Sequence, residues 1–356
     1  MKKIGIMSMQ RIINYGSYLQ AWGMKSLLEE LGYSDIEFID YKYERAVVNP
    51  KRRTLWERIK KNINIISYMK MKRHQKKFID TYNNEYLPKL INIDKFNYNK
   101  NIDTLIIGSD EVFNCLQGYP VGFSKNLFGE GYEKSKVISY AASFGFVKLE
   151  KLKEYGIDKE VGKLLKAFAS ISVRDENSCE IVKKLTEKKP EINLDPVLVA
   201  NFPYRNPQID INNYIIVYAY PGRLTREEQR EIKKIAQKNG KKIISIGSYQ
   251  EVADEIITIN PLDIFAYFNK ADFIITDTFH GTIFSIKANK KFCTIIRSSN
   301  KNKLIDLLNR LNLSNRAIKN VKEIEDMWNV EIDYKETNKI IEREKIKTRE
   351  YLEKNI

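Results

Sequence analysis

The stretch Lys3-Ile-Gly-Ile-Met-Ser8 opens the chain with an apolar run that has the length of one buried strand. Between Tyr18 and Leu31 the apolar residues recur every three or four positions, which predicts a helix with one buried face. Ile36-Glu-Phe-Ile-Asp-Tyr41 then alternates as a second strand. Strand, helix and strand at this spacing predict a βαβ unit, whose crossover requires parallel strands. The sequence therefore predicts an α/β protein.

The same alternation of strands and helices continues along the chain. In the first half we expect strands at Thr104–Ile107, Val137–Ala141 and Ser170–Val173, helices at Lys159–Phe168 and Glu176–Leu185, and a closing segment at Asp195–Val199. Turn formers fill Phe202–Pro207, as in an interdomain linker. Beyond it we expect strands at Tyr214–Tyr220, Lys242–Ile246, Phe273–Thr276 and Phe292–Ile296, and helices at Arg226–Asn239, Leu262–Asn269, Thr282–Ala288, Leu304–Leu311 and Tyr334–Lys354.

These elements predict two Rossmann-like, doubly wound α/β domains that face each other across a cleft. A chain of 356 residues exceeds the size at which one hydrophobic core stops growing. We expect an N-terminal domain over 1–205, a C-terminal domain over 206–333 and a C-terminal helix over 334–356. A basic insertion near 42–100 interrupts the first domain, with helices around Leu55–Ile66 and Lys70–Tyr86. Ligands of such sheets bind beyond the carboxyl ends of the strands.

The formal net charge of +15 is concentrated in the stretch between Lys42 and Lys77, which holds thirteen basic residues against Glu44 and Glu57. Such a stretch could attract nucleic-acid phosphates, anionic lipid head groups or a lipid-linked diphosphate. The alternative is a solvated helical surface. Aromatic residues are sparse in it, which argues against stacking on single-stranded nucleic acid. Contact with an anionic membrane, or a non-enzymatic role as a surface binder, stays open.

Composition also bears on the compartment. The longest apolar runs suit buried strands and are too short for bilayer helices, and no signal-peptide pattern follows Met1. The three cysteines, Cys115, Cys179 and Cys293, lie far apart, so we expect neither a disulfide framework nor a structural zinc site. We expect a cytoplasmic protein without a bound metal. Peripheral contact with the inner face of the membrane is compatible with this location.

Polar residues follow several of the predicted strands. Gly16 and Ser17 stand where the first helix begins, and amide groups at a helix start favour an anion, although glycine there can also be purely conformational. Asp110 and Glu111 follow another strand, where an acid serves as general base, binds a sugar hydroxyl or caps the next turn. Arg174 follows a third strand and is poised to bind phosphate or carboxylate, unless it pairs with Asp175 or Glu176.

The strongest local signal is Ile275-Thr-Asp-Thr-Phe-His-Gly-Thr-Ile-Phe284, in which a buried strand runs directly into a helix. The chain has only two histidines, His74 and His280, and His280 lies in this turn. Imidazole titrates near neutral pH, and the helix start beside it is an anion site, so we predict proton transfer by His280 rather than a structural role.

Six ordered segments resemble the polysaccharide pyruvyl transferase family, whose fold is GT-B-like. They are Asn14-Tyr-Gly16 with Leu19-Gln20, Ile107-Gly-Ser-Asp110 with Asn114, Tyr140-Ala-Ala-Ser-Phe-Gly145, Ser172-Val-Arg174 with Ser178, Asp195-Pro196, and Thr276-Asp-Thr-Phe-His-Gly281. The resemblance implies transfer of pyruvate from phosphoenolpyruvate to two hydroxyls of a sugar, with a ketal formed and phosphate released. It also implies an acceptor side in the first domain and a donor side in the second.

The resemblance also implies site residues. Arg174 and His280 match the family's donor contacts, and we expect them, with Asp110, to be catalytic. The family's lysine after the last strand has no clean counterpart: the register points to Asn300, one place before Lys301. Glu111 and Phe113 depart from the usual Gln and Trp. The substrate-binding residues we expect are Asn14, Gly16, Gln20, Asn114, Asp277, Gly281, Thr282, Arg297 and Lys301.

The chemistry of the donor agrees with these residues. Phosphoenolpyruvate carries a phosphate and a carboxylate close together, which suits two cations such as Arg174 with Arg297 or Lys301. We expect phosphoenolpyruvate and a sugar or lipid-linked glycan as partners, no further cofactor and no nucleic acid. The alternative function is a GT-B glycosyltransferase that uses a nucleotide sugar. The helix Thr282–Asn289 lacks the Asp or Glu with which many such enzymes bind the ribose, which counts against that donor.

Overall fold

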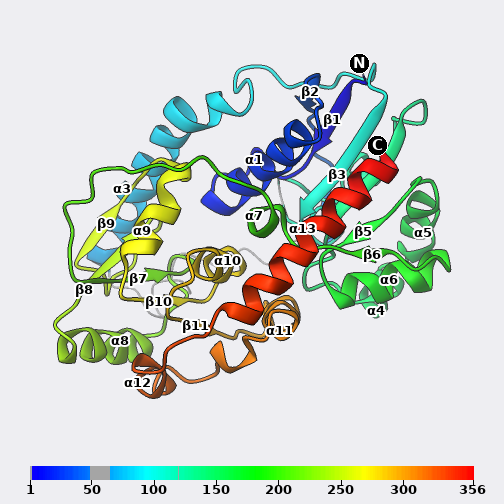
Figure 1. The fold of residues 1–356 in the computed structure, drawn as a ribbon. Coiled ribbons are helices and arrows are strands. Elements are labelled where there is room, and N and C mark those ends of the chain that lie inside the picture. The colour runs from blue at the N-terminus through cyan, green and yellow to red at the C-terminus, as the bar shows by residue number, and fades with distance from the viewer. Residues whose placement is uncertain (1, 49–64, 119) are drawn as a thin grey trace.

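A computed structural model describes residues 2–48, 65–118 and 120–356, and it contains two six-stranded parallel sheets (Figure 1). The first sheet has the strand order β2-β1-β3-β4-β5-β6. Its strands are β1 (Ile4–Met7), β2 (Ile36–Phe38), β3 (Thr104–Asp110), β4 (Lys136–Ala142), β5 (Ser172–Val173) and β6 (Glu191–Ile192).

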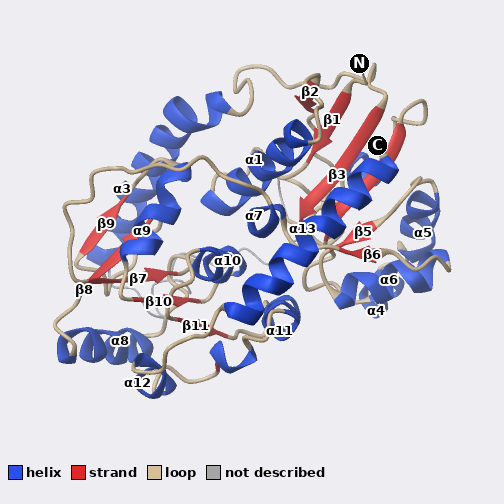
Figure 2. Cartoon of the chain, viewed as in Figure 1, coloured by secondary structure: helices blue, strands red, loops and turns tan. Residues whose placement is uncertain are grey.

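The second sheet has the order β12-β11-β10-β7-β8-β9. Its strands are β7 (Tyr214–Tyr218), β8 (Lys242–Ile246), β9 (Glu255–Ile257), β10 (Phe273–Thr276), β11 (Phe292–Ile295) and β12 (Ala317–Ile318). Every pairing in both sheets is parallel, and helices flank each sheet (Figure 2). The prediction of two Rossmann-like, doubly wound units of GT-B-like class is confirmed.

The longer helices follow the predicted pattern, with shifts of a few residues at their ends. In the first half they are α1 (Tyr15–Glu30), α3 (Ile65–Thr81), α4 (Leu149–Glu154), α5 (Asp158–Lys166), α6 (Glu176–Thr186) and α7 (Pro196–Val199). In the second half they are α8 (Arg226–Lys238), α9 (Ile264–Lys270), α10 (Phe279–Lys287), α11 (Lys301–Arg310), α12 (Glu323–Trp328) and α13 (Lys335–Asn355). Short π or 3-10 turns are η1 (Tyr82–Tyr86), η2 (Leu87–Lys89), η3 (Lys125–Phe128), η4 (Pro261–Asp263) and η5 (Ser314–Arg316).

Each sheet reverses its strand order at one point. In the first sheet the chain moves outward in both directions from the pair β1 and β3, where Met7 lies opposite Ile107. In the second sheet the reversal lies between β7 and β10, where Tyr218 lies opposite Thr276. Loops that leave adjacent strands in opposite directions open a crevice at such points. The sequence motifs around Asn14, Asp110 and His280 all begin at these strand ends.

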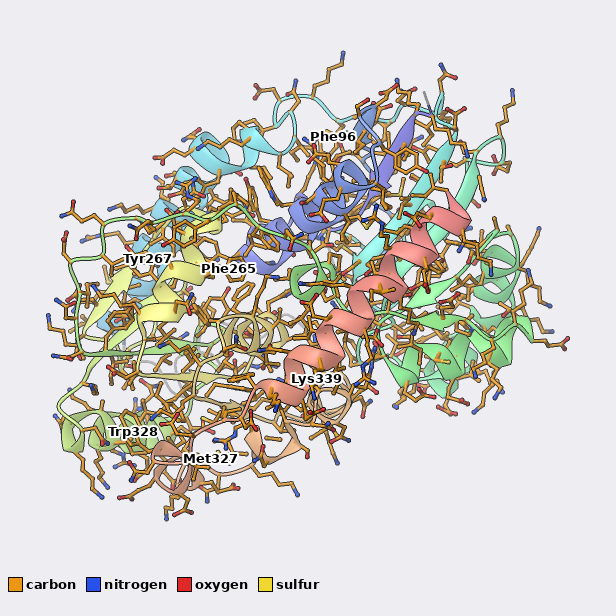
Figure 3. The ribbon with its side chains drawn as sticks, in the orientation of Figure 1. Phe96, Phe265, Tyr267, Met327, Trp328 and Lys339 are labelled. Atoms are coloured by element: carbon orange, nitrogen blue, oxygen red, sulfur yellow. The ribbon has the colours of Figure 1, made fainter. Side chains whose placement is uncertain are left out.

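The apolar core has three parts. One cluster covers the outer face of the first sheet, and another the outer face of the second, where Trp328, labelled in Figure 3, stacks on Phe273 with ring centroids 5.2 Å apart. The largest cluster contains residues of both halves, including Tyr15 and Phe78 together with Ile246. Because this core is shared, burial of apolar area stabilises the two sheets as one body.

The C-terminal helix α13 returns from the second sheet to the first (Figure 1). The Tyr351 hydroxyl donates to the Ser139 carbonyl at 2.8 Å, and the Tyr140 and Thr348 hydroxyls lie 2.9 Å apart. On this arrangement we propose residues 1–205 and 206–333 as the two domains, joined by the helix within 334–356.

The basic insertion is described only in part. Most of the predicted helix Leu55–Ile66 lies outside the described residues, and the predicted helix Lys70–Tyr86 is replaced by α3, which begins at Ile65, and by the turn η1. Although α3 belongs to the first half of the sequence, it lies beside the second sheet (Figure 1). Ser67 on α3 donates to Glu251 beyond β8 at 2.8 Å. Among the described helices, none combines the length and the apolar character needed to span a bilayer.

Candidate active site

The start of α1 brings the first half of the chain to His280. Asn14 caps this helix: its Oδ1 accepts from the Ser17 amide at 2.7 Å, and its Nδ2 donates to Ser17 Oγ at 3.0 Å. A Cβ on Gly16 would lie 2.2 Å from His280 Nδ1. Gly16 is therefore required by close contact with the imidazole of the other half, while the Asn14 side chain is engaged in capping.

Gln20 lies one turn further along α1 and is fully buried. Its Nε2 donates to Ser8 Oγ at 2.6 Å and to the Ser17 carbonyl at 3.2 Å. Gln20 thus supports the loop between β1 and α1 through Nε2, while its buried Oε1 has no hydrogen-bond partner among the described residues, and the substrate contact at Gln20 stays a prediction.

Asp110 ends β3 with φ = 80°, a backbone conformation that residues other than glycine seldom adopt. Its Oδ2 accepts from Ser17 Oγ at 3.3 Å, and its Oδ1 lies 3.6 Å from Arg174 Nη2. Among the described residues the Asp110 carboxylate therefore faces Ser17 and Arg174 instead of capping the next turn. Strained backbone of this kind is common at functional sites.

Arg174 follows β5 and is buried, with only 3% of its side chain exposed. Its Nη1 donates to Asp195 Oδ2 at 3.0 Å, and its guanidinium lies 4.1 Å above the Phe279 ring. The alternative partner Asp175 instead caps α6 by accepting from the Ser178 amide. Burial opposes the charged form of Arg174, but Asp110 and Asp195 outweigh it and raise the pKa of the guanidinium.

Asp195 is the residue on which both halves converge. Its Oδ2 accepts from Ser109 Oγ at 3.0 Å as well as from Arg174, and lies 3.8 Å from His280 Nε2. Burial alone would raise the pKa of this carboxyl, but the neighbouring His280 and Arg174 hold it well below its usual range. The sequence marked Asp195 only as part of the dipeptide Asp195-Pro196.

His280 lies in the first turn of α10, which begins three residues earlier than the sequence predicted. Thr278 caps this helix by accepting from the Gly281 amide at 2.9 Å. Gly281 is closely packed, since a Cβ there would lie 2.2 Å from Thr276 Oγ1. The Thr282 hydroxyl is buried against the Thr278 carbonyl and Thr294. Gly281 and Thr282 therefore pack the first turn of α10 against the end of β10, beside His280.

Three buried N–H or ring nitrogen positions in this cluster lack a hydrogen-bond partner in the described part of the chain. They are Nε and Nη2 of Arg174 and Nε2 of His280. Buried polar groups in folded proteins are nearly always paired, so unpaired donors on convergent side chains indicate a ligand site. Cationic donors suit an anion carrying phosphate or carboxylate groups.

A second cation reaches the cluster from α11. Lys303 Nζ donates to Glu111 Oε1 at 2.7 Å and lies 5.6 Å from the centroid of the Phe279 ring. Burial raises the pKa of Glu111, but Lys303 outweighs it and lowers that pKa to about 2. Asn114 Nδ2 also donates to Glu111, at 2.8 Å. The sequence missed Lys303. Its predicted counterpart Lys301 is exposed and lines a surface pocket with Lys148, away from this cluster.

The predicted residues Asp277 and Arg297 form a neighbouring group. Arg297 binds Glu228 of α8 with two hydrogen bonds of 2.6 and 2.9 Å. Asp277 Oδ2 lies 3.5 Å from Arg223 Nε and 3.6 Å from Arg297 Nε. Burial nevertheless raises the pKa of Asp277. Arg297 is thus held by Glu228, whereas the partly exposed Arg223, which the sequence did not single out, lies at the reversal point of the second sheet.

A cavity of about 330 Å³ adjoins the cluster and is lined in part by Asn14, Gly16 and His280. Arg174 is not among its lining residues. His280 therefore touches both the cationic cluster and this cavity. Among residues 2–48, 65–118 and 120–356, no group of three His, Cys, Asp or Glu side chains has the arrangement of a metal site.

Two parallel doubly wound sheets with a candidate site between their reversal points define a GT-B-like fold. The chain belongs to the polysaccharide pyruvyl transferase family, whose sequence profile matches residues 14–299. Curated protein sequences contain no significant match to it.

Solved structures share the fold at low sequence identity. The glycosyltransferase of kitacinnamycin is 8% identical with a TM-score of 0.50, over 100% of this chain and 99% of its own. MnaA of S. aureus, solved with UDP, is 12% identical with a TM-score of 0.44, over 99% and 97%. A mutant O-GlcNAc transferase of Thermobaculum terrenum is 10% identical with a TM-score of 0.42 over 98% of this chain. That match spans 64% of the O-GlcNAc transferase, less than two thirds of its length.

Proposed function

We propose that this protein transfers pyruvate from phosphoenolpyruvate to two hydroxyls of a sugar in a cell-surface polysaccharide or its lipid-linked precursor. The products are a cyclic ketal and inorganic phosphate. The observation that carries this proposal is the convergence of Arg174 and His280, one from each half, on Asp195 at 3.0 and 3.8 Å.

The donor is bound by the cationic cluster. Arg174 offers two N–H positions that have no partner among the described residues, in the planar arrangement that binds phosphate or carboxylate. Lys303 also lies near the Phe279 ring and supplies a second positive charge. A donor anion competes with Asp195 and Glu111 for these cations, so the carboxylates hold the site in shape before the donor binds.

The reaction needs a proton moved from a sugar hydroxyl to C3 of phosphoenolpyruvate. The first sugar oxygen bonds to C2 as C3 is protonated. The second sugar oxygen then bonds to C2 as the bond from C2 to the phosphate oxygen breaks, and phosphate leaves with the remaining proton. His280 is the proton-transfer residue in this proposal, since an imidazole ring can both accept and donate a proton. Asp110, 3.6 Å from Arg174, is the candidate for orienting the acceptor hydroxyl.

The acceptor class is consistent with a cytoplasmic enzyme that works beside the membrane. Helix α3 exposes Ile65, Ile66 and Met69 at 62%, 68% and 63%, next to exposed basic residues. Exposed apolar side chains beside lysines suit the interface of an anionic bilayer. This surface supports a lipid-linked glycan as acceptor.

The test is phosphate release from phosphoenolpyruvate in the presence of candidate glycans. His280→Ala should lower kcat at least ~10²-fold if His280 transfers a proton. Lys301→Ala is the matched control, because Lys301 is exposed and lines a surface pocket that includes neither Arg174 nor His280. Near-normal kcat in His280→Ala would exclude the proton-transfer role. Stabilisation of the protein by nucleotide sugars and not by phosphoenolpyruvate would favour a glycosyltransferase instead.

A further inference from the structure

The cavity beside His280 is formed by segments of both halves. The start of α1 and the inner face of α3 come from the first half, and the loops after β7 and β8 and the start of α10 from the second. Its volume of about 330 Å³ lies at the lower end of the range for small-molecule sites. The interface around it is tightly packed, since a Cβ on Gly247 would lie 2.4 Å from Tyr15 Cε2.

The lining of this cavity holds no permanently charged side chain. Nineteen described residues line it, and none of them is Lys, Arg, Asp or Glu. A phosphate or diphosphate placed there would lose its hydration without gaining a lysine or arginine partner, which is unfavourable. The adjoining cluster with Arg174 and Lys303 has the opposite character. The two neighbouring spaces therefore select different ligands, an anion in one and a neutral molecule in the other.

The lining also combines aromatic and polar groups. Five aromatic side chains contribute to it, namely Tyr15, Phe78, Tyr218, Tyr220 and Tyr249. His74 of α3 lines the same space, and its buried Nε2 has no hydrogen-bond partner within the described ranges. Burial lowers the pKa of His74, which favours the neutral ring, and the unprotonated nitrogen of a neutral imidazole can accept a hydrogen bond from a hydroxyl. An alkyl chain would leave this nitrogen unpaired, whereas a sugar hydroxyl would satisfy it.

We infer that this cavity binds one uncharged pyranose ring of the acceptor. The inference rests on the proposed pyruvyl transfer and adds the place and the chemical class of the acceptor. A ring in the cavity brings its hydroxyls to His280, whose other side faces Asp195 at 3.8 Å. The imidazole then stands between the sugar and the donor anion, where it moves a proton from one to the other. Helix α3 thus has two faces, an inner one for the sugar and an outer one toward the membrane.

The experiment fills the cavity with a larger side chain at an exposed position and leaves the residues of the hydrophobic core unchanged. Gln75→Trp adds bulk at an exposed α3 position whose side chain lines the cavity, and Asp80→Trp adds the same bulk at an exposed α3 position that does not line it. His74→Phe keeps a ring and removes Nε2. Two readouts are compared in the full chain with methyl glycosides of hexoses and N-acetylhexosamines. One is saturation-transfer NMR in the presence of inorganic phosphate, and the other is phosphate release from phosphoenolpyruvate.

We expect Gln75→Trp to abolish the NMR signal of a bound glycoside and to raise the acceptor KM at least ~10-fold, the scale of losing one hydrogen-bonded or packed contact. The KM for phosphoenolpyruvate should stay within about twofold of wild type, since the donor cations are untouched. Asp80→Trp should match wild type, and His74→Phe should raise the acceptor KM.

The outcomes separate this inference from the proposed reaction. Glycoside binding to wild type that Gln75→Trp leaves unchanged overturns the cavity assignment, as does the absence of any glycoside signal. Glycoside binding that Gln75→Trp removes, without phosphate release from phosphoenolpyruvate, upholds the sugar site and overturns the reaction. Binding of alkyl chains in place of glycosides would also contradict the inference.

Discussion

His280 is held in one orientation by contacts from both halves. Its ring lies edge-on to Phe279 with centroids 5.6 Å apart, packs 6.1 Å from Phe284, and rests on the bare α-carbon of Gly16. Its Nε2 points toward Asp195 at 3.8 Å. Positioning a proton-transfer group by packing fixes the distance over which the proton moves.

Gly16→Ala should therefore lower kcat at least ~10-fold, because the added methyl occupies the place of the imidazole and displaces it from Asp195. Steady-state phosphate release measures the effect, with far-ultraviolet circular dichroism to verify the fold. Gly23→Ala on the same helix is the control, since its Cβ would lie 3.2 Å from its nearest neighbours. Equal kcat for Gly16→Ala and Gly23→Ala would show that the contact with Gly16 does not position His280.

At the scale of single residues, the sequence predicted those site residues that are the single candidate of their kind in a turn after a strand. Arg174 directly follows a buried strand, and His280 is one of two histidines and lies in the turn after another buried strand, so the pattern identifies them. Lys303 could not be identified, because which of Lys301 and Lys303 points inward depends on the rotation of α11 about its axis. Arg297 lies in the predicted place, but its partner Glu228 is sixty-nine residues away in sequence.

The sequence predicts the bounds of helices and strands well where the short-range signals are clear. It misses elements that are too short to show a periodic pattern. Strands β1 and β10, with four buried residues each, were predicted within two residues. Strand β3 extends three residues beyond its predicted end at Ile107, and the two-residue strand β5 lies within the predicted Ser170–Val173. The two-residue strands β6 and β12 owe their existence to pairing with neighbours, and a run of that length carries no periodicity. Helix α10 begins at Phe279 because Thr278 caps it, a choice that a sequence with threonines at 276, 278 and 282 leaves ambiguous.

The exposed basic residues of helix α3 lead to a prediction about membrane binding. Replacing its exposed basic residues with Gln should reduce co-sedimentation with anionic vesicles at least ~10-fold, since each Lys or Arg near such a surface contributes about 1 kcal/mol. The five substitutions are at Lys70, Lys72, Arg73, Lys76 and Lys77. A matched control neutralises five exposed basic residues of α8, at Arg226, Arg230, Lys233, Lys234 and Lys238. Unchanged binding of the α3 variant would contradict the proposed membrane contact.

The whole molecule depends on contacts that join the two halves. Lys303 of α11 binds Glu111 of the first half, and Arg310 of the same helix donates to the Arg174 carbonyl at 3.1 Å. With the shared core and the return of α13, these contacts keep the cationic cluster assembled. None of these contacts can be predicted from local sequence patterns, because each joins segments more than a hundred residues apart.

Asp306, which also lies on α11, leads to a predicted pH dependence of the protein's stability. Burial raises the pKa of Asp306 on α11 to about 6, helped by Asp175 and Glu176 at the start of α6 and opposed by Arg310. A carboxyl whose pKa is higher folded than unfolded contributes stability below its ordinary value of 3.8, and that stability is lost as pH rises through 6. Asp306→Asn should therefore raise the free energy of unfolding at pH 8 by roughly 1 kcal/mol, after allowing for solvent screening, and have little effect at pH 4.

Urea unfolding of wild type and Asp306→Asn at the two pH values measures this difference. Asp326→Asn, at an exposed position on α12, is the control. A stabilisation of Asp306→Asn that is equal at both pH values would mean that titration of this carboxyl is not its cause.

The most direct test of the central claim is calorimetric titration of phosphoenolpyruvate into wild type, Arg174→Lys and His280→Gln. We expect one site per chain in wild type and at least ~10-fold weaker binding in each variant, because each replaces a donor from a different half of the molecule. Equal affinity in all three proteins, or no binding to wild type, would contradict a donor site built from both halves.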